Sequence, residues 1–99
     1  MPSLGSRIRD ESMDVQFSRK FAKQYDLTPA NVREAFHERL QLFLENVFHP
    51  ILNNHALAGK WNGCRSINVT GDWRAVFQER EHKMLMYFVA IGTHSKLYR

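Results

Sequence analysis

The spacing of apolar residues in the first third of the chain predicts a short strand followed by a helix. Met13, Val15 and Phe17 alternate with polar residues, and a period of two is typical of a half-buried strand. Phe17, Phe21 and Tyr25 recur at every fourth position among basic residues, which is the spacing of a short amphipathic helix. The ordered domain is therefore expected to begin near Met13, and the two predicted elements overlap at Phe17.

A longer helix is predicted to begin at Thr28-Pro29 and to end at His49-Pro50. Thr28 is expected to cap the free amide groups, and a proline at the first helical position loses no hydrogen bond. One apolar stripe runs between these limits at spacings of four, four, three and four residues: Val32, Phe36, Leu40, Phe43 and Val47. We interpret this stripe as part of the core and not as a cofactor-binding face.

In the second half of the chain the apolar period changes to two, which predicts three strands. Residues 65–70 and 73–79 alternate and are separated by the turn dipeptide Gly71-Asp72. Residues 83–91 are almost wholly apolar, as expected for a strand that is buried on both faces. These elements predict an α+β fold, in which an N-terminal strand and two helices pack on an antiparallel sheet completed by a three-stranded meander.

The length and the cysteine content limit the class of protein. The 99 residues correspond to one domain, because a second core forms only well beyond about 200 residues. We assign residues 13–99 to this domain and expect residues 1–12 to form a flexible extension. The longest apolar run has eight residues, whereas a membrane-spanning helix needs about 20. Residues 1–12 lack the apolar segment of a secretory signal, so we expect a cytoplasmic location and no membrane partner.

Cys64 is the only cysteine of the chain. An internal disulfide and a cysteine-rich zinc site are therefore excluded. No histidine pair has the i, i+4 spacing of a helical zinc site. We expect neither a metal ion nor another cofactor.

The net charge of +4 comes from the second half of the chain. Residues 1–54 hold seven basic and seven acidic side chains, whereas residues 55–99 hold seven basic and three acidic ones. Segregated positive charge favours a partner with a phosphate backbone, because cation–phosphate contacts release counterions and supply sequence-independent affinity. The alternative interpretation is a basic surface that only keeps the protein soluble.

The residue types needed for RNA chemistry gather in this basic half: His55, Lys60, Arg65, Asn68, Asp72, Trp73, His94 and Tyr98. RNA is cut without a metal ion when a base removes the 2′-hydroxyl proton, a cation stabilises the phosphorane and an acid protonates the 5′-oxygen. Imidazole and carboxylate groups can serve the proton steps, and aromatic rings can stack on bases. Each residue also has a structural interpretation: a lone histidine is more often a surface or capping residue, Asp72 follows a turn glycine, and a tryptophan most often packs in a core.

Three motifs in this half resemble the RelE superfamily of bacterial toxin–antitoxin systems, and its YafQ-like branch in particular. They are a His-x-Leu-x-Gly-x-Trp stretch at residues 55–61, an Asp-Trp pair at residues 72–73 and a Gly-Thr-His-Ser-x-Leu stretch at residues 92–97. The resemblance extends over about residues 13–98. It implies an mRNA interferase, which enters the ribosomal A site and cuts the messenger there without a metal ion. The implied partners are a cognate antitoxin, mRNA and the 70S ribosome, with operator DNA reached only through the antitoxin complex.

The resemblance also implies a set of site residues. His55, Asp72 and His94 match functional positions of the family, Trp73 completes the Asp-Trp pair, and Tyr98 stands where the family often has phenylalanine. We therefore expect a catalytic set of His55, Asp72, His94 and Tyr98 and an RNA-binding set of Lys60, Arg65, Trp73, Arg74 and Lys96. Which histidine is the acid and which is the base stays open.

Two alternatives remain at this stage. Asn68 stands where several YafQ-like members carry another histidine, and an asparagine cannot act as a base at neutral pH, so a homologue deficient in cleavage is one alternative. A non-enzymatic toxin of the same fold, similar to the gyrase inhibitor ParE, is the other. A protein that acts only by binding has no need of acid–base side chains, so the presence of four such residues favours the enzyme: His55, Asp72, His94 and Tyr98.

Overall fold

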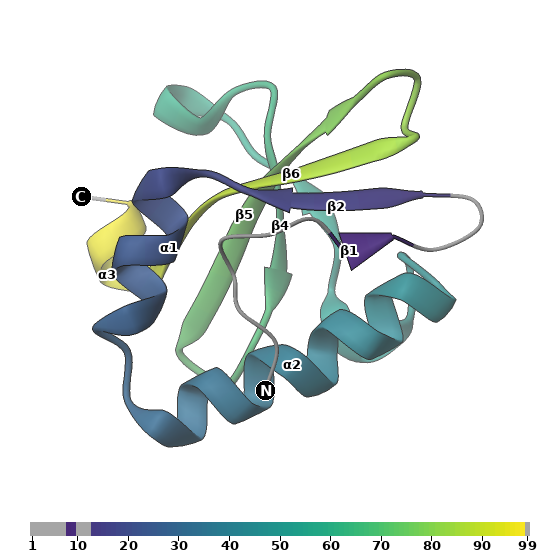
Figure 1. Ribbon diagram of the computed structural model, residues 1–99. Coiled ribbons are helices and arrows are strands. Elements are labelled where there is room, and N and C mark those ends of the chain that lie inside the picture. The colour runs from purple at the N-terminus through teal and green to yellow at the C-terminus, as the bar shows by residue number, and fades with distance from the viewer. Residues whose placement is uncertain (1–7, 10–12, 99) are drawn as a thin grey trace.

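A sheet at the centre of the molecule brings together strands from both ends of the chain (Figure 1). The computed structural model describes residues 8–9 and 13–98. Within this part of the chain the sheet has six strands in the order β1-β2-β6-β5-β4-β3. The elements are, in sequence, β1 (Ile8–Arg9), β2 (Asp14–Phe17), α1 (Arg19–Asp26), α2 (Ala30–Glu45), the 3-10 turn η1 (Pro50–Leu52), β3 (His55–Ala56), the 3-10 turn η2 (Gly59–Trp61), β4 (Arg65–Asn68), β5 (Trp73–Arg80), β6 (Leu85–Thr93) and α3 (His94–Leu97).

The α+β fold is confirmed, but the sheet is mixed and not antiparallel throughout as the sequence pattern led us to expect. β2 pairs with β6 in parallel, with Val15 opposite Met86 and Phe17 opposite Phe88, whereas the other neighbouring strands pair antiparallel. A parallel pair needs a long connection, and α1, α2 and three further strands separate β2 from β6 along the chain. A period of two identifies the faces of a strand but not its direction, which is why the sequence pattern could not give this pairing.

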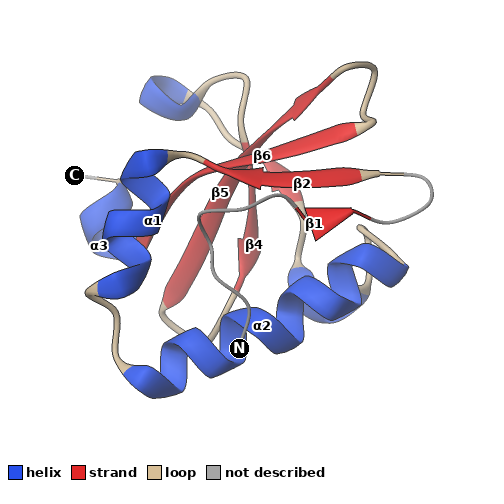
Figure 2. Ribbon diagram, in the orientation of Figure 1, coloured by secondary structure: helices blue, strands red, loops and turns tan. Residues whose placement is uncertain are grey.

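Helices α1 and α2 pack on one face of the sheet and bury an aromatic core (Figure 2). Phe88 of β6 lies at its centre, because its ring centroid is 5.3–5.8 Å from those of five other rings: Phe17, Phe21, Phe36, Phe43 and Phe77. The apolar stripe of α2 is buried as predicted. These rings supply much of the apolar area that folding removes from water.

The ends of α2 differ from the prediction. Pro29 is the N-cap residue of α2, and Thr28 makes no capping hydrogen bond to it. Instead the Thr28 hydroxyl donates to the carbonyl of Tyr25 at 2.8 Å, at the end of α1, so it interacts with the preceding helix and not with the first amides of α2. At its other end α2 stops at Glu45, and His49 begins η1 by accepting from the amide of Ile51.

A smaller apolar cluster lies on the opposite face of the sheet. Its buried members are Cys64, Val76, Ala90 and Leu97, and Leu57, Trp61 and Val89 pack against it. Leu97 belongs to α3, a helix of four residues that is too short for periodicity to predict. The small cluster thus attaches the C-terminal turn to the back of β5 and β6.

The remaining sequence predictions concern the ends of the chain. Within the predicted extension, Ile8 and Arg9 form β1 next to β2, and the rest of residues 1–12 lies outside the described part. None of the described helices is long and apolar enough to cross a membrane.

We expect the substitution Phe88→Ala to lower the free energy of unfolding by about 3–5 kcal/mol, because it leaves a cavity at the point where the five rings meet. Urea denaturation followed by tryptophan fluorescence measures this change. Leu27→Ala is the matched control, since the Leu27 side chain is 87% exposed and its truncation is expected to change stability by no more than about 0.5 kcal/mol. Equal stability of the two variants would contradict the central position of Phe88.

Candidate functional site

A depression of about 420 Å³ opens on the face of the sheet that α1 and α2 leave uncovered. It is lined by Asn53, His55, Ala56, Leu57, Ala58, Ser66, Arg74, His94 and Tyr98. Four of the residues singled out from the sequence meet here: His55 from β3, Arg74 from β5, His94 from α3 and Tyr98 just after it. Two imidazoles, one guanidinium and one phenol are thus brought together from distant parts of the chain.

The position of His94 and Tyr98 depends on how α3 is attached. Leu97 is buried, and its side chain would lie 3.4 Å from a β-carbon at position 92, so Gly92 lets α3 approach β6 closely. The indole Nε1 of Trp61 donates to the carbonyl of Leu97 at 2.7 Å. With one side of α3 held in this way, the rings of His94 and Tyr98 lie on its exposed side with their centroids 4.7 Å apart.

The backbone of Asp72 contributes to the site more directly than its side chain. The amide of His94 donates to the carbonyl oxygen of Asp72 at 2.9 Å, where the end of β6 passes the turn between β4 and β5. The Asp72 side chain is exposed and does not line the depression. Asp72 therefore orients His94 through the main chain.

The imidazole of His55 has a defined tautomer. Its Nδ1 lies 2.7 Å from the carbonyl oxygen of Asn53, and because a carbonyl only accepts, Nδ1 must carry the hydrogen. In the neutral ring the lone pair is then on Nε2, which makes Nε2 the atom able to take up a proton. Asn53 adopts a left-handed conformation with φ of 47°, which asparagine tolerates better than most residues.

Arg74 is held by the turn that precedes it. Its Nη1 donates to the carbonyls of Thr70, Gly71 and Trp73 at 3.0, 3.2 and 3.0 Å, and its Nη2 donates to Gly71 at 3.2 Å. These partners are neutral carbonyls, so they fix the guanidinium in place without compensating its positive charge. The depression therefore has a fixed cation in its wall.

Two of the expected cations, Arg65 and Lys60, point away from the depression. Arg65 donates through Nε to Oδ1 of Asn54 at 2.8 Å, and its guanidinium lies 5.5 Å from the centroid of the Phe48 ring. The Nζ of Lys60 lies 5.6 Å from the centroid of the Trp61 ring. Neither cation lines the depression.

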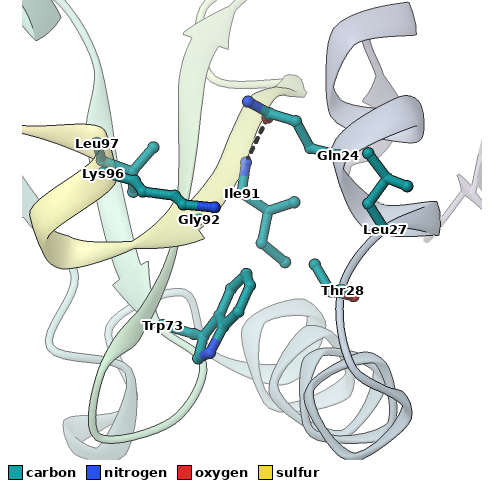
Figure 3. Close-up of a pocket in the computed structure, with 8 residues that line it drawn as sticks. All are labelled: Gln24, Leu27, Thr28, Trp73, Ile91, Gly92, Lys96 and Leu97. Carbon is teal, nitrogen blue, oxygen red and sulfur yellow. Dashed lines mark hydrogen bonds between the residues drawn. The ribbon is translucent and has the colours of Figure 1, made fainter.

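Trp73 and Lys96 line a second, smaller depression of about 180 Å³ (Figure 3). It lies between α1 and the β6–α3 segment, and Gln24 closes one side by accepting from the amide of Ile91 at 3.0 Å. Trp73 is half-buried and packs against the aromatic core, which agrees with the alternative that this tryptophan has a structural role. Trp73 and Arg74 are consecutive in β5, so their side chains leave on opposite faces of the sheet.

Sequence reasoning missed five residues that complete the depression: Asn53, Ala56 of β3, Leu57, Ala58 and Ser66. A serine within an alternating strand carries no distinctive pattern, and β3 has only two residues. Within the described residues there is no group of three or more histidine, cysteine, aspartate or glutamate side chains placed to hold a metal ion.

Comparisons with known proteins identify the family and the fold. The profile of the family described as the bacterial toxin of type II toxin–antitoxin systems, YafQ, matches residues 12–99. The crystal structure of YafQ from E. coli strain BL21(DE3) has 24% sequence identity and a TM-score of 0.70, with 88% of this chain and 99% of that chain covered. YafQ in the E. coli DinJ–YafQ toxin–antitoxin complex has 24% identity and a TM-score of 0.69, with 89% and 99% covered.

A more distant similarity is found to the RelBE2 toxin–antitoxin complex of Mycobacterium tuberculosis. The identity is 15% and the TM-score is 0.60, with 81% of this chain and 95% of that chain covered. At these identities the solved structures establish the fold, which is that of RelE-like and YafQ-like toxins. A search of curated protein sequences finds no match.

We expect Trp61→Phe to loosen α3 without disturbing the sheet, because it removes the Nε1 donor and keeps an aromatic ring. The lost hydrogen bond should lower stability by about 0.5–1.5 kcal/mol and speed hydrogen exchange at the Tyr98 amide, which donates to the carbonyl of His94. Amide exchange followed by NMR measures this. Asn62→Ala, an exposed neighbour in the same turn, is the control, and slow exchange at Tyr98 in both variants would show that Trp61 does not hold α3.

Proposed function

This chain belongs to the YafQ family of toxins of bacterial type II toxin–antitoxin systems, and on that premise we propose that it is a ribosome-dependent endoribonuclease. It cuts mRNA in the ribosomal A site by attack of a 2′-hydroxyl on the neighbouring phosphate, without a metal ion. The observation that carries this proposal is the gathering of His55, Arg74, His94 and Tyr98 around one depression. The compartment that this function requires is the cytoplasm, where the ribosomes are.

The four side chains supply the groups that the reaction needs. One imidazole removes the proton of the 2′-hydroxyl and the other protonates the departing 5′-oxygen. His55 is suited to either step, because Nδ1 is occupied by Asn53 and Nε2 exchanges the proton. The guanidinium of Arg74, fixed by three carbonyls, stabilises the additional negative charge of the phosphorane, and a cation that is already in place needs no rearrangement during the reaction.

The other predicted residues take supporting roles in this proposal. Asp72 orients His94 through its carbonyl oxygen. Arg65 supports the segment before His55 through Asn54. Lys60 and Lys96, both exposed, contact the phosphate backbone of RNA outside the reacting nucleotide.

Tyr98 is proposed to contact a base with its ring. It is 37% exposed and lies beside His94, so a base placed on it would bring the adjoining phosphate to the imidazole. Trp73 lies in the second depression and is proposed to contact RNA there.

The proposed protein partner is a cognate antitoxin. Two of the similar toxins were solved in toxin–antitoxin complexes, DinJ–YafQ and RelBE2. An acidic or amphipathic segment laid across Lys60, Arg65 and Arg74 would neutralise their charge and block access to the ribosome. Operator DNA is reached only through that complex.

A ParE-like gyrase inhibitor is the competing function within this fold. Binding to gyrase gives no reason for His55, Arg74 and His94 to be fixed around one depression by backbone carbonyls. The arrangement therefore favours cleavage of RNA.

We expect the upstream fragment of the cut messenger to end in a 2′,3′-cyclic phosphate or a 3′-phosphate, because the 2′-hydroxyl is the nucleophile. Mass spectrometry of products from programmed ribosomes measures this, and a messenger with a 2′-deoxynucleotide at the cut site should stay intact. A 3′-hydroxyl end would exclude the mechanism.

His94→Ala is expected to slow single-turnover cleavage on programmed ribosomes by about 10²- to 10⁴-fold, because it removes one proton-transfer group, while ribosome binding is retained. Tyr98→Phe should keep most of the activity and Tyr98→Ala should not, because the ring is what contacts the base. Ser95→Ala is the control, since Ser95 lies between them in α3 with its side chain exposed. Full activity of His94→Ala would remove the acid–base proposal, and full activity of Tyr98→Ala would remove Tyr98 from the site.

A further inference from the structure

Ser66 is buried in an unusual way. Its side chain has no exposed surface, and its Oγ has no hydrogen-bond partner within the described part of the chain. The large majority of buried polar atoms are hydrogen-bonded, and one without a partner destabilises the folded state. An alanine at this position would avoid that penalty, so a serine here calls for an explanation.

The strand pairing places the Ser66 side chain on the face that carries the site. Ser66 of β4 is directly opposite His55 of β3 and directly opposite Val76 of β5, and residues paired in this way project on the same face of a sheet. Arg74, two residues before Val76 in β5, shares this face. Ser66 itself lines the 420 Å³ depression with His55 and Arg74.

On the β5 and β6 side of this row the neighbours of Ser66 give its hydroxyl nothing to bind. Val76 and Ala90, the next residues across the sheet, are apolar members of the small cluster. The unpartnered oxygen therefore lies between an apolar cluster and the depression. Because Ser66 has no exposed surface in this structure, a ligand oxygen reaches its hydroxyl only when the side chains around the depression shift. A ligand that enters the depression in this way is the partner that the geometry offers.

We propose that Ser66 is a substrate-contacting residue, whose hydroxyl donates a hydrogen bond to a non-bridging phosphate oxygen of a bound ribonucleotide. This inference rests on the proposed function, since it names a further contact at the same site. A phosphate is favoured because Arg74 lines the same depression and its positive charge draws an anion to it. A hydroxyl at the floor adds a short, charge-assisted O–H···O⁻ bond that a methyl group cannot make.

Such a role predicts opposite effects on stability and on function. Ser66→Ala removes a buried polar atom without a partner, so the Tm should rise by roughly 4–8 °C, whereas cleavage on programmed ribosomes should fall by about 10- to 100-fold. Ile67→Val is the matched control, because it shortens a fully buried side chain next to Ser66 that belongs to the core on the other face of the sheet and does not line the depression. It should lower the Tm and leave cleavage unchanged, and Ser66→Thr, which keeps the hydroxyl, should retain cleavage.

Binding of a nucleotide tests the contact independently of cleavage. Adenosine 3′-monophosphate and 2′-deoxyadenosine 3′-monophosphate, titrated by NMR, should both bind Ser66→Ala about 10- to 100-fold more weakly than the unaltered protein. Weakening for the ribonucleotide alone would mean that Ser66 contacts the 2′-hydroxyl and would overturn the phosphate assignment. Unchanged binding of both nucleotides, or a lower Tm of Ser66→Ala, would overturn the proposal altogether.

These readouts separate the two proposals. If the unaltered protein cleaves mRNA and Ser66→Ala cleaves equally well, the role of Ser66 is wrong and the proposed function stands. If the unaltered protein does not cleave but binds both nucleotides through Ser66, the contact stands and the proposed function is wrong. If the unaltered protein neither cleaves nor binds, both are wrong.

Discussion

The central strands β5 and β6 contribute side chains to both faces of the sheet, and the rest of the structure depends on this constraint. Side chains alternate along each strand, so Phe77 and Phe88 pack under the helices while Val76 and Ala90 face the other way. Because the second set is small, a shallow apolar cluster forms there and leaves room for α3 to lie close to β6. The same pair of strands thus carries the core on one side and the candidate site on the other.

Backbone carbonyls, more than side-chain networks, hold the site in place. His55 is fixed by Asn53, Arg74 by three carbonyls of the preceding turn, and His94 by Asp72. Exposed side chains normally sample several rotamers, and an anchored one loses less entropy when it meets a substrate. For the proposed transesterification, this is the kind of arrangement in which charge stabilisation is prepared before the reaction.

The sequence predicted those features that repeat along the chain and missed those that depend on two or three residues. The stripe of α2 and the alternation in β5 and β6 span many positions, so their buried faces were predictable. The direction of β2, the two-residue β3 and the four-residue α3 have no period to detect. In the site, His55, His94 and Tyr98 followed from resemblance and Arg74 from its place in the basic half. The pair Asp72-Trp73 suggested two neighbouring functional side chains, yet a turn followed by a strand sends the indole of Trp73 to the core side.

Several features of the candidate site lower the stability of the folded state, and their position in the molecule points to function. Asn53 adopts a left-handed backbone conformation, and the Ser66 hydroxyl has no partner within the described part of the chain. The Arg74 guanidinium donates to neutral carbonyls, whereas a carboxylate would have compensated its charge. Departures from the most stable choice that collect in one place indicate function, because selection removes them where nothing is gained. An uncompensated cation beside an unpaired hydroxyl attracts an anion, whether this is the phosphate of RNA or an acidic segment of the proposed antitoxin. If the proposed antitoxin places an acidic segment in the depression, that segment contacts the same groups as the phosphate, and the two partners then exclude each other.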